Sequence, residues 1–321
     1  MRLEYCPSAD SVHTVYKRKR TVQEKRAMNT PTVSIVLPCY NGARFLAASL
    51  DSILAQTFTD WELIIVNDHS TDASPQIANQ YAARDPRIRV IHNETNLKLP
   101  ASLNVGFGAA RAPYLTWTSD DNMAKPDWLS TLVEYLNAHP DTDMVCADMD
   151  LIDEDANTYG KLSDGCDRTV TELSYKSNVG AAFMYRRAIA DKIGGYDEVM
   201  FCAEDYDYWV RIALAGRLDY IDANIYRYRQ NPGSLTATQQ PRIWAKTTVI
   251  KNKYHTRWGD RLKLGWWGRK KLAYLCRNPY PRAEFSLVGM RHLFVRQIIG
   301  LVFCWNPKLR RQIKNKFEVK L

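Results

Sequence analysis

The chain has 321 residues, 45% of them hydrophobic, which is enough for one large or two modest domains with a real core. Its formal net charge of +9 is uneven: residues 1–30 carry seven basic and three acidic residues, residues 236–321 carry 20 and three, and residues 31–235 are left with −12. An acidic body argues against a nucleic-acid groove, and a basic end favours contact with an anionic surface.

The cysteines and the N-terminal segment point to a cytoplasmic protein. Seven cysteines are scattered along the chain without a Cys-x-x-Cys pair, which favours a reducing compartment and no structural zinc. Residues 1–30 are polar and basic around Lys17–Arg20 and lack the apolar core of a secretory signal. We therefore expect a disordered leader over residues 1–30.

Short apolar runs alternate with helical patterns along the middle of the chain. The predicted strands cover residues 33–37, 61–66, 88–92, 114–119, 144–149, 179–185 and 218–229. The predicted helices cover residues 46–56, a segment that ends at 84, 99–111, 126–139 and a segment that begins at 204. This alternation predicts an α/β fold with a mostly parallel sheet flanked by helices. Residues 152–178 are polar and are expected to form an irregular, mobile loop.

Polar residues follow three of the predicted strands directly. In a parallel sheet Pro38–Asn41, Asn67–Asp72 and Asp120–Asn122 lie at the carboxyl ends of neighbouring strands and should line one crevice. Asp120 and Asp121 are two adjacent like charges, which favours a cation beside them; a solvated turn is the alternative. Such a site holds Mg²⁺ or Mn²⁺ through one or two carboxylates and the phosphates of a substrate.

A separate acid, far along the chain, could act as a general base. Asp205 is the best candidate. The alternative is that Glu204 and Asp205 only complement the dipole at the start of a helix. Asp68 suits a base edge or a ribose, because its charge would repel phosphate. Together these residues describe an enzyme that holds a nucleoside diphosphate and transfers its substituent to a hydroxyl.

In this order the segments resemble the family 2 glycosyltransferases, which have the GT-A (Rossmann-like) fold and use nucleotide sugars. The resemblance runs from about Thr32 to Thr236. Val33–Gly42 (VSIVLPCYNG) is similar to the first strand and turn of the family. Ser52–Asp72 is the strongest part, with the spacing and ending of the nucleotide-binding loop.

The resemblance implies a role for each of several residues. Those expected to bind the nucleotide sugar are Pro38, Tyr40, Asn41, Asp68, Lys98, Asp120 and Arg229. Asp121 is the expected ligand of Mn²⁺ or Mg²⁺, and Asp205 is the expected catalytic base. Glu204, Trp209 and Arg211 are expected on the acceptor side.

Two positions depart from the family pattern. Thr118 stands where many members have the first Asp of Asp-x-Asp-Asp, so the site has one carboxylate fewer. Lys98 and Leu99 occupy a loop in which a Gly is common after Asn96, and Lys98 could meet a phosphate.

The implied activity is an inverting transfer of a hexosyl or N-acetylhexosaminyl group from a nucleotide sugar, with a UDP-sugar as the expected donor. The expected acceptor is a hydroxyl of a saccharide or a lipid-linked saccharide, in the synthesis of cell-surface polysaccharide or glycolipid. Two alternatives remain open. A nucleotidyltransferase also uses a strand-end acid pair, but it would want a Gly-rich basic loop after the first strand, where this chain has Pro38–Arg44. A non-catalytic nucleotide-sugar-binding protein would use the same pocket.

The C-terminal region, residues 236–321, is expected to be a basic, aromatic-rich helical extension of a domain that covers residues 31–235. Residues 285–305 are mostly apolar but carry Arg291, His292 and Arg296, so they do not predict a spanning helix. They predict either an interfacial helix on anionic lipid or a packed core helix. We therefore expect peripheral contact with the inner face of the cell membrane.

Overall fold

The computed structural model describes residues 30–162, 173–175, 177–266, 268–270 and 272. The expected leader up to residue 29 and the segment 285–305 lie outside these residues. Among the helices described, none is both long enough and apolar enough to cross a membrane.

The first half of the sheet is parallel. Strands β1 (Val33–Cys39), β2 (Trp61–Asn67), β3 (Ile88–His92) and β4 (Tyr114–Trp117) lie side by side in the order β3-β2-β1-β4. All seven residues of β1 and of β2 are buried, because helices cover both faces of the sheet, and this explains their near-continuous apolar sequences. The carboxyl ends of β2, β1 and β4 therefore meet at one edge, as predicted.

The second half of the sheet mixes directions. Strand β8 (Phe183–Arg186) is antiparallel to β4 and to β6 (Met144–Ile152). Strand β9 (Leu218–Arg229) is parallel to β6, and β5 (Met123–Ala124) is antiparallel to β9. Strand β7 (Thr158–Leu162) pairs with β6. The parallel arrangement predicted from the sequence thus holds for β1–β4 and for the β6–β9 pair.

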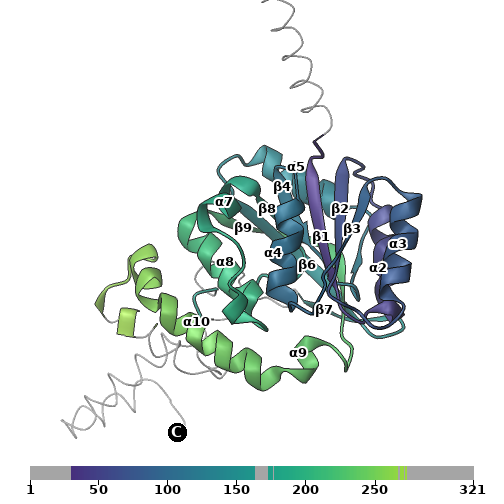
Figure 1. Ribbon diagram of the computed structural model, residues 1–321. Coiled ribbons are helices and arrows are strands. Elements are labelled where there is room, and N and C mark those ends of the chain that lie inside the picture. Colours follow the sequence, from purple (N-terminus) through teal and green to yellow (C-terminus); the bar gives the residue numbers. More distant parts are fainter. Residues whose placement is uncertain (1–29, 163–172, 176, 267, 271, 273–321) are drawn as a thin grey trace, which may run out of the picture.

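Helices cover both faces of the sheet (Figure 1). One face carries α2 (Ala43–Leu54), α3 (Ser74–Arg84) and α5 (Trp128–Ala138). The other carries α4 (Leu99–Ala109), α7 (Arg187–Ile193), the short helix η1 (Glu198–Met200), α8 (Glu204–Ala215) and α10 (Gln240–Arg261), with α9 (Leu235–Thr238) preceding α10. Each face has its own core, and large aromatic side chains such as Trp128 and Trp209 fill the space between helix and sheet.

Two local predictions were wrong, and two elements were missed. Residues 152–178 were expected to be irregular, but β7 covers Thr158–Leu162, and residues 163–172 and 176 lie outside the described residues. The strand expected from Val179 begins only at Phe183, because Gly180 has φ +76° and leaves the extended conformation. The helix α7 and the two-residue strand β5 were not predicted.

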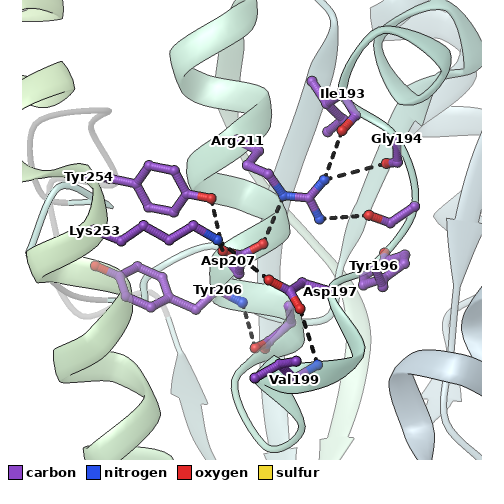
Figure 2. Close-up of polar contacts among 12 residues, drawn as sticks. Ile193, Gly194, Tyr196, Asp197, Val199, Tyr206, Asp207, Arg211, Lys253 and Tyr254 are labelled. Carbon is purple, nitrogen blue, oxygen red and sulfur yellow. Dashed lines mark hydrogen bonds and ion pairs between the residues drawn. The ribbon is translucent and has the colours of Figure 1, made fainter.

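Helix α10 packs on α8 through Ile250, Tyr254 and Trp258, which are all buried. Beside this contact the carboxylate of Asp207 on α8, which is fully buried, accepts hydrogen bonds from Tyr254 Oη at 3.0 Å and from Arg211 Nε at 2.7 Å (Figure 2). Thus the described part of the basic C-terminal region is attached to the helix that carries Asp205.

At the opposite end of the sheet from the crevice, Glu62 is buried and satisfied by several donors. Its carboxylate accepts hydrogen bonds from Ser34 Oγ (2.7 Å), Arg111 N (2.8 Å), Arg111 Nε (2.9 Å) and Arg89 Nη2 (3.0 Å). Burial alone would raise the pKa of Glu62, but the hydrogen bonds from Ser34 and Arg111 outweigh it and hold the pKa below its usual value of 4.5.

Glu62→Gln should therefore lower the free energy of unfolding by about 2–3 kcal/mol at neutral pH, because charge-assisted bonds to a buried carboxylate are lost. A lowered folded pKa means that this contribution is complete above the usual value of 4.5 and disappears as the pH falls through the folded pKa. Urea denaturation of wild type and variant at pH 7 measures the loss of unfolding free energy, and the same experiment at pH 3 shows whether the difference disappears. Glu134→Gln, on the exposed side of α5, is the control; an equal loss in both variants would contradict the role of Glu62.

Candidate active site

The loops after β1 and β2 are tied to each other at the crevice. Asn41, with φ 55°, donates its backbone N–H to Ser70 Oγ (3.0 Å) and accepts the backbone N–H of Thr71 at its Oδ1 (2.8 Å). Tyr40 precedes it and is 52% exposed, so its ring is available to a ligand. Pro38, in contrast, is buried within β1. Among the residues predicted to surround the nucleoside, Tyr40 is thus exposed to solvent, and Asn41 joins the loops after β1 and β2.

Asp68, the predicted contact for a base, holds the loop between β3 and α4. It is 3% exposed, and its Oδ1 accepts the backbone N–H of Leu97 (2.8 Å) and the Asn93 amide (2.9 Å). Its Oδ2 accepts the backbone N–H of Lys98 at 2.9 Å. Each carboxylate oxygen has two lone pairs, so Oδ2 retains one for a donor on a ligand.

Lys98 adopts a backbone conformation that suits glycine. Its φ of 75° and ψ of 164° fall in a region that costs a residue with a Cβ about 1–3 kcal/mol. This is the position near which the family pattern commonly has a Gly. The side chain of Lys98 is exposed.

Lys98→Gly should raise the free energy of unfolding by about 1 kcal/mol, because relief of strain exceeds the extra entropy of an unfolded glycine. Lys98→Ala keeps the Cβ and removes only the exposed amine, so it should show no such gain. Chemical denaturation of the two variants separates the effects. Equal stabilisation by Gly and Ala would contradict the strain at this residue.

The acid pair follows β4. Gly42 leaves room for the Asp120 side chain, because a Cβ on Gly42 would lie 2.0 Å from Asp120 Oδ2. Burial and the charge of Asp121 raise the pKa of Asp120 to about 7, although the Cys39 thiol donates a hydrogen bond to it. Burial also raises the pKa of Cys39, so this residue is a neutral thiol.

Asp121 is oriented by two side chains. Its Oδ1 accepts from Ser119 Oγ at 2.7 Å, and its Oδ2 accepts from Asn231 Nδ2 at 2.8 Å. Burial raises the pKa of Asp121 in spite of these bonds. A divalent cation beside these two adjacent carboxylates would stabilise their charged forms, which burial and mutual repulsion disfavour.

The donor set is small. No group of three or more His, Cys, Asp or Glu side chains converges in the described part of the chain. One or two carboxylates are what Mg²⁺ or Mn²⁺ takes from a protein when the phosphates of a substrate and water supply the other ligands. Asp121 and Asp120 therefore fit a cation that is bound together with a diphosphate.

Thr118 does not point to this site. It is buried, and its hydroxyl forms a hydrogen bond with the hydroxyl of Tyr226 on β9. The residue that replaces an acid of the family pattern thus links β4 to β9, and the acids of this strand end are Asp120 and Asp121.

Arg229, predicted to help hold the diphosphate, is buried beside the acid pair. Its Nε donates to the carbonyl oxygen of Asp121 (2.8 Å), and its Nη1 donates to the carbonyl oxygens of Asp153 (2.7 Å) and Glu154 (2.6 Å). Its Nη2 donates to Met123 Sδ at 3.5 Å. These contacts engage four of the five guanidinium N–H groups. Arg229 therefore shapes the wall behind Asp121.

Glu204 and Asp205 form the first turn of α8. Burial raises the pKa of Asp205, and burial together with the Asp205 charge raises the pKa of Glu204 to about 8. Glu204 Oε2 is buried without a hydrogen-bond partner, and Asp205 Oδ1 accepts the N–H of Tyr206 at 2.6 Å. Burial and mutual repulsion thus favour a neutral form for one member of this pair.

Burial raises the pKa of one hydroxyl, that of Tyr228, and the charges of Asp121 and Asp205 both raise it further. Tyr228 lies on β9 immediately before Arg229. The two acids come from segments 84 residues apart in the sequence, and the fold brings both near this hydroxyl.

Trp209 and Arg211, predicted on the acceptor side, support α8. The Trp209 ring lies 4.3 Å from that of Phe183 in the core. Arg211 donates to the carbonyl oxygens of Ile193 (3.0 Å) and Gly195 (2.8 Å) in addition to its contact with Asp207 (Figure 2).

Three residues of the site were not predicted, namely Gly42, Ser119 and Asn231, whereas Cys39 falls within Pro38–Asn41, which was predicted to line the crevice. Gly42 and Ser119 have a sequence signal, since each lies next to a predicted site residue. Asn231 has none, because its contact with Asp121 joins positions 110 residues apart.

A parallel half-sheet that ends on an acid pair, with a further acid on α8, is the arrangement of a GT-A-type transferase. The Glycosyl transferase family 2 model matches residues 34–195, about half of the chain. The chain belongs to this family and is a glycosyltransferase.

Curated relatives support the family. The chain is 30% identical over 301 residues to the uncharacterized glycosyltransferase EpsJ of Bacillus subtilis, with 90% of this chain and 83% of EpsJ covered. It is 29% identical over 228 residues to the uncharacterized protein y4gI of Sinorhizobium fredii, covering 69% of this chain. The chain spans only 25% of the length of y4gI.

Solved structures share the fold. S. aureus TarS 1-349 in complex with UDP-GlcNAc aligns with a TM-score of 0.62 at 18% identity, covering 80% of this chain and 73% of TarS. Mannosyltransferase PcManGT from Pyrobaculum calidifontis, in complex with GDP-Man and Mn²⁺, aligns with a TM-score of 0.56 at 16% identity, covering 91% of this chain and 88% of PcManGT.

Proposed function

We propose that this glycosyltransferase moves a hexosyl or N-acetylhexosaminyl group, with inversion, from a nucleoside-diphosphate sugar to an acceptor hydroxyl. The acid pair at the end of β4 supports the proposal, because Ser119 and Asn231 orient Asp121, and so does Asp205 in the first turn of α8. A single displacement needs a base on one side of the anomeric carbon and charge stabilisation on the other.

Each acid has one task in this mechanism. The Asp205 carboxylate accepts the proton of the acceptor hydroxyl as that oxygen attacks the anomeric carbon, and the bond to the diphosphate breaks. Asp121, with Asp120, would hold Mn²⁺ or Mg²⁺, which supplies Lewis-acid stabilisation of the leaving diphosphate. Much of the rate would come from holding acceptor and donor in line.

The donor side is proposed to recognise a nucleotide sugar through Tyr40 and the free lone pair on Asp68. UDP is the proposed nucleotide, and the UDP-GlcNAc and GDP-Man of the two solved structures support a nucleoside-diphosphate sugar of this general kind. The Lys98 amine is proposed to meet a phosphate, because it is exposed at the loop that Asp68 holds.

The proposed acceptor is a saccharide or a lipid-linked saccharide of cell-surface polysaccharide or glycolipid synthesis. The basic composition of residues 236–321 supports contact with an anionic membrane surface, and we propose a cytoplasmic protein peripheral to the inner face of the cell membrane.

The test is a panel of UDP- and GDP-sugars, incubated with the full chain and candidate acceptors with and without Mn²⁺. We expect nucleoside diphosphate to be released from one donor or a few, and a chelator to stop the release. Absence of release from every donor, with the protein folded and Mn²⁺ present, would contradict the proposed donor class.

A further inference from the structure

Arg44 lies in the first turn of α2, and a single carboxylate holds its guanidinium. Its Nη1 and Nη2 donate to the two carboxylate oxygens of Glu154 at 2.9 Å and 3.2 Å. The side chains are partly exposed, 63% for Arg44 and 38% for Glu154. Water and salt screen an ion pair of this exposure, so it adds little to stability. The Arg44–Glu154 pair can therefore separate at little cost.

This pair lies on the rim of the acid site. Gly42 lies against the Asp120 carboxylate, and Arg44 comes two residues after Gly42. Two Cα–Cα steps of about 3.8 Å place the Arg44 Cα within about 7.6 Å of the Gly42 Cα. The other partner, Glu154, is joined to Asp121 through Arg229, which donates to both backbone carbonyls. Arg44 and Arg229 also contact the same Phe45 ring, at 4.7 Å and 4.5 Å from its centre.

Besides the exposed Lys98, the site needs a further positive charge for the diphosphate. A nucleoside diphosphate adds negative charge beside Asp120 and Asp121, and one divalent cation neutralises only part of it. Arg229 has four of its N–H groups engaged by carbonyl oxygens and Met123 Sδ. Lys125, just after the acid pair, forms an ion pair with Asp150 at 2.8 Å. Arg44, in contrast to Arg229 and Lys125, is paired with Glu154 in an ion pair that solvent screens.

We propose that Arg44 binds the diphosphate of the donor and that Glu154 competes for the same guanidinium. A planar guanidinium donates two parallel hydrogen bonds to phosphate as it does to carboxylate, so the exchange replaces one bidentate contact by another. The inference rests on the proposed function, because the diphosphate is part of the donor.

The experiment compares a nucleoside with its diphosphate. UDP, GDP, uridine and guanosine are titrated into the full chain with Mn²⁺, with binding followed by NMR of the ligand. Arg44→Ala should weaken binding of the diphosphate about tenfold, the effect of one charge-assisted contact, and leave the nucleoside unchanged. Glu154→Gln should tighten binding of the diphosphate, because it frees Arg44. In the double variant this gain should disappear.

Arg84→Ala, which removes another exposed charge in the last turn of α3, is the control and should change the binding of neither ligand. Three results would overturn the inference alone, provided that the wild type binds a diphosphate. Arg44→Ala could bind the diphosphate as well as the wild type does, or lose affinity for the nucleoside to the same degree as for the diphosphate. Glu154→Gln could bind the diphosphate more weakly than the wild type does. A wild type that binds no nucleoside diphosphate overturns the proposed function and this inference with it.

Discussion

Asp205→Asn should reduce transfer by about a thousandfold or more and leave nucleotide binding within a few-fold of the wild type. An amide cannot accept the proton of the acceptor hydroxyl, and general bases contribute about 10²–10⁴-fold to enzymatic rates. The raised pKa of Asp205 places it closer to working pH than an exposed Asp would be. Release of nucleoside diphosphate in the presence of acceptor measures the loss, and titration with the diphosphate measures binding.

Glu204→Gln is the matched control for this substitution, since it changes the neighbouring acid to its amide. With a pKa of about 8, Glu204 is protonated at pH 7, and glutamine resembles that neutral form. We expect transfer by Glu204→Gln to stay within a few-fold of wild type at pH 7. Above pH 8 the wild-type rate should show a titration that this variant lacks. Equal loss in both variants, or full activity of Asp205→Asn, would contradict the role of Asp205.

Asp121→Asn should abolish the dependence of donor binding on Mn²⁺ and lower transfer by about a hundredfold or more. The substitution removes the charge on which a cation site of only one or two carboxylates depends. The same change should not lower the Tm, because burial raises the pKa of Asp121 and thus disfavours its charge in the free protein.

Asp155→Asn is the control for Asp121→Asn. Asp155 is an exposed acid in the turn between β6 and β7, close in sequence to the wall of the site. It should retain transfer and its dependence on Mn²⁺. Retained dependence on Mn²⁺ in Asp121→Asn, or an equal loss in Asp155→Asn, would show that Asp121 does not hold the cation.

The sequence predicts the parallel half of the fold well, because buried parallel strands are short apolar runs that end on polar residues. The runs that begin at Val33 and Trp61 meet this condition, and both strands are buried along their whole length. The polar residues after β1, β2 and β4 consequently meet at one edge of the sheet. The shared edge of these loops was therefore predictable from the strand pattern.

The other half of the sheet lacks such signals. Strand β7 has four of its five residues exposed, including Tyr159 and Leu162, so its sequence has no apolar alternation. Gly180 delays the start of β8, and β5 has only two residues. Contacts between distant residues were equally invisible, as in the bond from Asn231 to Asp121 and the bond between Arg44 and Glu154. Both depend on the return of β9 and of the β6–β7 turn to the end of β4.

The anomeric configuration of the product tests the central claim most directly. The donor that the panel identifies is incubated with acceptor and Mn²⁺, and the first product formed is examined by proton NMR. A single displacement with Asp205 as base predicts the configuration opposite to that of the donor, and no product in Asp205→Asn. A product that retains the configuration of the donor would contradict this mechanism.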